Sequence, residues 1–115
     1  MQILRALLIV GWLVVMGVSM HAIQAMGASA SADIFMRDFS HPWRAQFNTD
    51  FSLHLLLMAL WILYREKSLI RGIPFAMLSI VGGGAFSLAY ILVATFAAKG
   101  DFGRLLLGGH ATLPA

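Results

Sequence analysis

Residues 6–18 are Ala-Leu-Leu-Ile-Val-Gly-Trp-Leu-Val-Val-Met-Gly-Val, a run without a single charged side chain. With its flanks, this run predicts a membrane-spanning helix over residues 3–23, close to the ~20 residues that a hydrocarbon core of about 30 Å requires. The whole chain agrees, because 60% of its 115 residues are hydrophobic, 11% are charged and the mean hydropathy is +0.84. This composition has too little polar surface for a soluble domain and indicates an integral membrane protein.

Two further apolar stretches, at residues 49–64 and 73–98, predict two more spans. We therefore expect a single all-α membrane domain over residues 1–115, with three transmembrane helices in a small antiparallel bundle. Residues 33–39 alternate charged and apolar side chains, which predicts a short amphipathic surface segment before the second helix. Residues 99–115 are expected to form a peripheral tail.

The first stretch also has an alternative interpretation as a cleaved signal peptide. Arg5 precedes the apolar run, and Ala28-Ser29-Ala30 satisfies the small-residue cleavage pattern. The extension of the apolar run through His21 and Ile23 favours a retained span.

The net charge of +3 comes from basic residues scattered between the apolar stretches, a pattern typical of topology signals rather than of a nucleic-acid surface. Three of them, Arg65, Lys67 and Arg71, lie in the short loop between the second and third stretches. We therefore expect a protein of the bacterial inner membrane, with its N-terminus in the cytoplasm and its C-terminus in the periplasm.

Enzyme signatures are missing from the sequence, and there is no cysteine for disulfides, thiolate zinc sites or iron–sulfur clusters. The chain has no nucleophile elbow, phosphate-binding glycine loop, zinc-protease helix or dinucleotide fingerprint. We expect no enzymatic activity and no catalytic residue.

Asp50 and His54 are the most unusual residues of the second stretch, because four-residue spacing places both on one helix face. Ionisable groups at membrane depth are costly and usually face a partner, a cavity or the interior of a bundle. The simplest explanation is that Asp50 caps the second helix near its N-terminus while His54 donates a hydrogen bond to a neighbouring helix.

Two histidines offer an alternative role in cofactor binding. His21 and His54 are expected near the same membrane boundary, where neutral imidazoles could ligate a haem b, with Asp50 behind one of them. Gly17-x-x-x-His21 also allows a chlorophyll-type pigment. Proton or ion handling through Asp50, His54, Ser87 and Tyr90, and a metal held by His41, Asp50 and His54, are further alternatives with less support.

Small and aromatic residues indicate helix association. Ser79, Gly83 and Ser87 recur at four-residue spacing and would let another helix approach closely. Trp43 and Trp61 stand where interfacial anchors or partner contacts are expected. Arg65-Glu66-Lys67 is expected to be a solvated turn, with Arg71 as an ion-pair partner for Glu66.

Residues 42–92 resemble an uncharacterised, domain-of-unknown-function family of small multi-helix membrane proteins of bacteria and plants. The resemblance is carried by His41-Pro42-Trp43, Asp50, Trp61-x-x-Tyr64-x-Glu66 and Gly84-x-x-Ser87-x-x-Tyr90. It implies a compact helical membrane fold and gives weight to five positions, Pro42, Trp43, Asp50, Trp61 and Glu66. It implies no activity, and His21 and His54 lie outside its pattern.

Together, these features predict a small accessory or scaffold subunit that acts by helix–helix association, without chemistry or a cofactor of its own. Its partners would be the lipid bilayer and a larger membrane complex or further copies of the chain, not nucleic acid. The alternative is a subunit of electron transfer or light harvesting that binds haem b or a chlorophyll-type pigment through His21, His54 or both.

Overall fold

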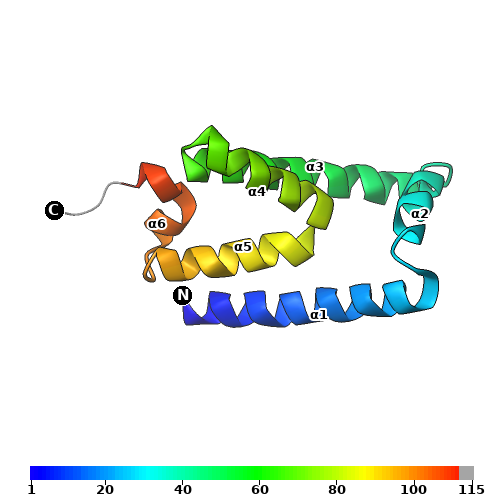
Figure 1. The fold of residues 1–115 in the computed structure, drawn as a ribbon, viewed down its shortest axis with the longest axis horizontal. Coiled ribbons are helices and arrows are strands. Elements are labelled where there is room, and N and C mark those ends of the chain that lie inside the picture. Colours follow the sequence, from blue (N-terminus) through cyan, green and yellow to red (C-terminus); the bar gives the residue numbers. More distant parts are fainter. Residues whose placement is uncertain (112–115) are drawn as a thin grey trace.

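A computed structural model describes residues 1–111, and in this range every regular element is a helix (Figure 1). The longest two are α1 (Gln2–Met26) and α3 (Pro42–Glu66), each of 25 residues. The shorter helices are α2 (Ala30–Asp38), α4 (Leu69–Gly82), α5 (Gly84–Ala97), α6 (Phe102–Leu107) and the 3-10 turn η1 (Gly108–His110).

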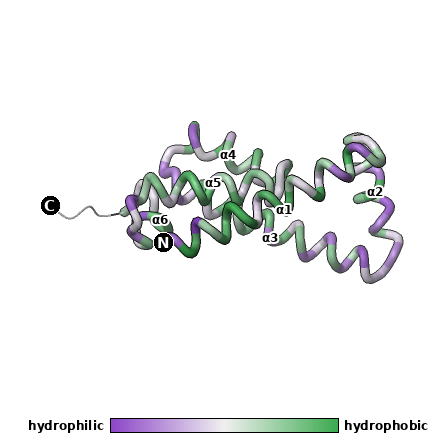
Figure 2. The backbone as a smooth tube through the Cα atoms, turned by 90° about the horizontal axis from the view of Figure 1, so that it is seen from below, coloured by the Kyte–Doolittle hydropathy of each residue, from purple (hydrophilic) through white to green (hydrophobic). Residues whose placement is uncertain are grey.

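The helices are arranged as a hairpin held between two long antiparallel helices (Figure 1). α1 packs along α5, and α3 packs along α4. α4 and α5 reverse about halfway along the molecule, so that the far halves of α1 and α3 have no hairpin between them and are bridged by α2 (Figure 1). Figure 2 shows polar segments gathered at the two ends of the molecule and apolar segments between them.

The prediction of a three-helix transmembrane bundle is wrong, because the third predicted span at residues 73–98 is two helices. The chain turns back at Gly83, whose φ of 56° and ψ of −136° suit glycine alone. α4 and α5 have 14 residues each, or about 21 Å at 1.5 Å per residue, which is too short for a 30 Å core. Within the described residues, α1 and α3 are the two helices long and apolar enough to cross a membrane.

The second predicted span begins earlier than expected, at Pro42 instead of residue 49. Proline suits the first turn of a helix, and the backbone N–H of Arg44 donates to Nδ1 of His41 at 3.4 Å. His41 therefore caps α3, and the prediction that Asp50 caps this helix is wrong. Asp50 lies more than two turns inside it.

The first predicted span corresponds to α1, which is bonded to α5 at two places. Nε of Arg5 donates to Oγ1 of Thr95 and Nη2 to the Thr95 carbonyl, both at 3.0 Å. Nε1 of Trp12 donates to the Ala85 carbonyl at 3.0 Å. These bonds fix the position of α1 along the hairpin.

The C-terminal segment is predicted to be a peripheral tail over residues 99–115. Within the described residues 99–111 it instead forms a capped helix that packs on the rest of the chain. The side chain of Asp101 caps α6 by accepting from the backbone N–H groups of Gly103 and Arg104. Leu105 is buried with Ala94 and Ala98 of the preceding segment. Residues 112–115 of the predicted tail lie outside the described range.

The N-terminus and α6 lie at the same end of the molecule (Figure 1). The expectation of chain ends on opposite sides of a membrane depended on a third span, and residues 73–98 are two short helices instead. α2 covers most of the segment expected to be amphipathic, and none of its residues is buried.

Candidate functional site

Asp50 and His54 form an exposed pair on α3. Nε2 of His54 lies 3.3 Å from Oδ1 of Asp50, and the two side chains are 73% and 57% exposed, respectively. Among the described residues, neither side chain makes another hydrogen bond or ion pair. Within the described residues, His54 donates to no neighbouring helix, and its polar contact is with Asp50 of the same helix.

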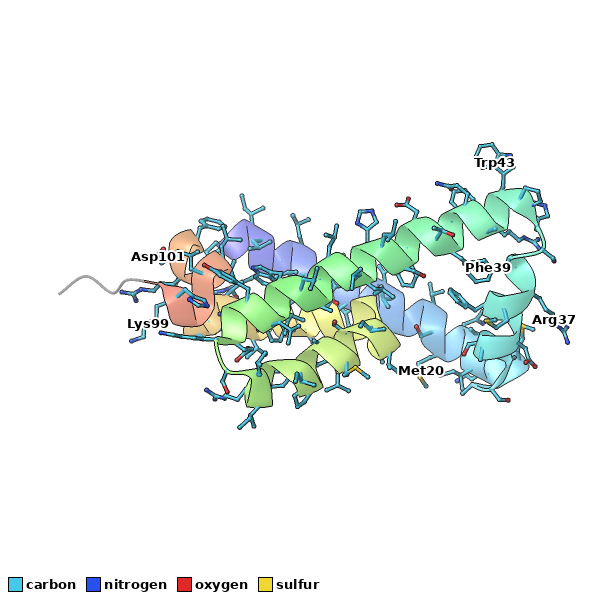
Figure 3. All side chains as sticks on the ribbon, turned by 90° about the horizontal axis from the view of Figure 1, so that it is seen from above. Met20, Arg37, Phe39, Trp43, Lys99 and Asp101 are labelled. Carbon is cyan, nitrogen blue, oxygen red and sulfur yellow. The ribbon has the colours of Figure 1, made fainter. Side chains whose placement is uncertain are left out.

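A shallow depression of about 510 Å³ lies beside this pair. Its lining comes entirely from the first half of α3: Pro42, Ala45, Gln46, Thr49, Asp50 and Leu53. The exposed Trp43 points away from the molecule at the start of the same helix (Figure 3). We call the surface formed by Asp50, Leu53, His54 and this depression the α3 outer face.

The structure places the two predicted histidine ligands on different helices. His21 is exposed on α1, which packs on α5, whereas His54 is exposed on α3, which packs on α4. No hydrogen bond or ion pair in the described range connects the two residues, and His41 is used as the cap of α3. Across residues 1–111, no three His, Asp or Glu side chains are grouped closely enough to hold a metal ion.

The small-residue strip is divided by the hairpin turn. Ser79 is fully buried in α4 and donates to the Ala76 carbonyl at 2.7 Å. Gly83 forms the turn, where a Cβ would lie 3.3 Å from Cζ of Phe51, and Ser87 is partly buried in α5. The three residues therefore do not share one continuous helix face.

A second polar cluster lies at the opposite end of α3. Nη1 of Arg65 is 3.7 Å from Oε1 of Glu66, and the Tyr90 hydroxyl donates to the same carboxylate oxygen. The Arg65 and Glu66 side chains are only 12% and 15% exposed, so they do not form the solvated turn that was expected. The predicted ion pair of Glu66 with Arg71 is wrong, because Arg65 holds that position.

This cluster anchors the C-terminal segment to α3. Nε1 of Trp61 donates to the Leu106 carbonyl at 3.0 Å, and Nε of Arg65 donates to the Leu105 carbonyl at 2.8 Å. Gly108 has a φ of 54° and sits directly on Arg65, where a Cβ would overlap the arginine. The segment thus covers the end of α3.

Sequence reasoning did not identify Arg65 and Tyr90 as parts of one cluster. The only available signal was the presence of Glu66 and Tyr90 in the motifs of the family resemblance. Spacing along the chain could not connect them, because the contact between α3 and α5 depends on the reversal at Gly83.

Comparisons with other proteins give no match to a family model, a curated protein or a solved structure. The resemblance of residues 42–92 to a family of small membrane proteins therefore stays a prediction.

Proposed function

We propose that this chain is a small accessory subunit of the membrane that acts by binding another helix, without chemistry of its own. Its membrane location is supported by the length and composition of α1 and α3. Along α1, apolar side chains such as Leu7, Val10, Leu13 and Val14 are exposed. Such a row of exposed apolar side chains would be unfavourable in water and is favourable in lipid.

The charge distribution supports one orientation in the membrane. Two of the eight Lys and Arg residues, Arg37 and Arg44, lie near α2, and the remaining six lie at the other end. These six are Arg5, Arg65, Lys67, Arg71, Lys99 and Arg104. Because Lys and Arg are enriched on the cytoplasmic side, we place the N-terminus and α6 in the cytoplasm and α2 on the outer side.

The observation that carries the proposed association is the exposure of Asp50 and His54 on a spanning helix. His54 is the middle residue of α3, about 18 Å from either end at 1.5 Å per residue. In a centred helix it lies near the bilayer midplane, where an uncovered ionisable pair is expensive. A partner that covers the α3 outer face removes this cost.

The partner's chemistry follows from the face it covers. Leu53 and Leu57 are exposed beside the pair and offer apolar contacts. We infer a transmembrane helix with one polar side chain that bonds to Asp50 or His54, supplied by another subunit or by a second copy of this chain.

Photocrosslinking in native membranes tests this association. A photoreactive residue replacing Leu53, which is 56% exposed on the α3 outer face, is expected to capture a protein in defined stoichiometry. The matched control is Leu13 of α1, which is 58% exposed and lies on a different helix. Capture at Leu53 is also expected to fall in the double variant Asp50→Asn, His54→Gln.

The proposal fails if Leu53 captures only lipid, or if Leu13 captures the same protein equally well. A visible spectrum of the purified assembly tests the alternative role in the same sample. A Soret band that disappears on His54→Gln would favour a haem subunit over an accessory protein.

A further inference from the structure

A basic cleft of about 560 Å³ lies at the cytoplasmic end of the proposed orientation. It is lined by parts of α3, α4, α5 and the C-terminal segment. Four of its lining residues are cations, Arg65, Arg71, Lys99 and Arg104, and one is an acid, Glu66. Figure 3 shows Lys99 at this end, opposite the end that carries Arg37 and Trp43.

The cleft has positive charge that the described side chains leave unbalanced. Glu66 is already paired with Arg65 and accepts from the Tyr90 hydroxyl. Asp101 is near in sequence, but its carboxylate accepts from backbone N–H groups at the start of α6. Within residues 1–111, Arg71, Lys99 and Arg104 form no ion pair.

Arg104 is one of the cations that line the cleft. Its Nε is buried, and no hydrogen-bond acceptor is found for it among the described residues. A buried donor without an acceptor is unfavourable, and most such donors in proteins are paired.

An apolar crevice of about 470 Å³ between α4 and α5 adjoins the basic cleft. Arg65, Glu66, Arg71 and Ala97 line both cavities, so the two lie side by side. The remaining lining of the crevice is aromatic or aliphatic apart from the Tyr90 hydroxyl, and comprises Phe75, Phe86, Ala89, Tyr90, Val93 and Ala94. The combined site is cationic at one end and apolar along its length.

We propose that this site binds one anionic phospholipid of the cytoplasmic leaflet. Its phosphate lies among Arg71, Lys99 and Arg104, and one acyl chain lies along the crevice. From Ala97 to Phe86, α5 spans about 16 Å, roughly half of a 30 Å hydrocarbon core and therefore one leaflet. Basic pockets between helices on the cytoplasmic side suit anionic headgroups of this kind.

This inference rests on the membrane location in the proposed function, but it uses a different surface from the α3 outer face. The two therefore fail separately. Loss of the Leu53 crosslink leaves lipid binding intact, and loss of lipid selectivity leaves the partner bound.

Titration of the intact protein in detergent micelles, read by native mass spectrometry, tests the site. The probes are dioleoyl phosphatidylglycerol, dioleoyl phosphatidylcholine with the same chains, and inorganic phosphate. We expect selective binding of phosphatidylglycerol, with little binding of phosphatidylcholine and none of free phosphate at the same concentration.

The variant Arg71→Gln, Lys99→Gln changes two exposed side chains and leaves the Arg65 cluster in place. Its affinity for phosphatidylglycerol is expected to be about 25-fold weaker, since each cation near an anionic lipid contributes about fivefold. The control Arg37→Gln, Arg44→Gln removes the same charge at the opposite end. Val93→Trp fills the crevice at an exposed position and is also expected to weaken binding.

Equal binding of the two phospholipids overturns the proposal, as does an equal loss of binding in the Arg37 and Arg44 control. If inorganic phosphate bound as strongly as the lipid, the site would recognise the phosphate alone. That result would contradict the role of the crevice in binding an acyl chain. Circular dichroism of each variant separates loss of binding from loss of helical structure.

Discussion

At the scale of single residues, Thr95 shows how a polar side chain determines where a long apolar helix lies. It is fully buried in α5, donates to the Leu92 carbonyl and accepts from Nε of Arg5. The guanidinium also stacks over the Phe96 ring at 4.1 Å from its centroid. Apolar contacts are not directional and do not by themselves set how two helices align along their lengths. These hydrogen bonds are directional, so they define the register of α1 against α5.

Thr95→Val is therefore expected to destabilise the protein by about 1–3 kcal/mol, because Nε of Arg5 loses its acceptor at a partly buried site. Thermal unfolding in detergent micelles, followed by circular dichroism, measures the change. The control is Thr49→Val, since Thr49 is exposed and bonds only to the Ala45 carbonyl of its own helix. A change within about 0.5 kcal/mol is expected there. Equal destabilisation by both substitutions would contradict the proposed register role.

At the scale of elements, Gly83 decides whether residues 69–97 make one long helix or a hairpin. Its positive φ disfavours any side chain, and an added Cβ would lie only 3.3 Å from Cζ of Phe51. The flanking Gly82 and Gly84 weaken helical continuity further, since glycine is the poorest ordinary helix former after proline.

Gly83→Ala is expected to lower the free energy of unfolding by about 1–3 kcal/mol, the usual cost of an unfavourable backbone conformation. The matched control is Gly17→Ala in α1, where an added Cβ meets nothing within 4 Å. This control is expected to be about 0.5–1 kcal/mol more stable, because alanine favours the helix. Unfolding in micelles compares the two, and an unchanged or raised midpoint for Gly83→Ala would argue against the hairpin.

At the scale of the whole molecule, the predicted third span is replaced by the α4–α5 hairpin, so that α1 and α3 are the two long helices. The start of α4 and the end of α5 lie at the same end of the molecule. The start of α4 and the whole of α6 lie at the end that also holds the N-terminus (Figure 1). Ser68 directly precedes α4, Leu106 belongs to α6, and Gln2 begins α1. Ser40 lies at the opposite end, between α2 and α3. A three-span arrangement would separate Ser68 from Leu106.

Single-cysteine labelling distinguishes the two arrangements, and the cysteine-free chain needs no background substitutions. In sealed native vesicles of known orientation, Gln2→Cys, Ser68→Cys and Leu106→Cys are expected to react with an impermeant maleimide from the same side. Ser40→Cys is expected to react only from the other. Labelling of Leu106→Cys together with Ser40→Cys would rule out the hairpin topology.

Local features could be predicted from the sequence where one segment suffices to define them. The length and apolar character of α1 predict its helix, and four-residue spacing predicts that Asp50 and His54 share a face. The same local signals failed at residues 73–98, because a stretch rich in Ile, Val, Leu and Ala predicts a span whether or not a glycine turn interrupts it. They also misplaced the start of α3, where the Pro42 and His41 cap lay upstream of the apolar run.

By itself, then, the sequence determined an apolar, helical chain with basic residues around its helix ends, because composition and periodicity are properties of single segments. Only the tertiary structure decided which ends meet. Folding back at Gly83 brings α5 beside α1 and places Tyr90 against Glu66, contacts between residues far apart in the chain. The same reversal brings Lys99 and Arg104 to the end that holds four other basic residues, because packing distributes charge in space and sequence spacing does not.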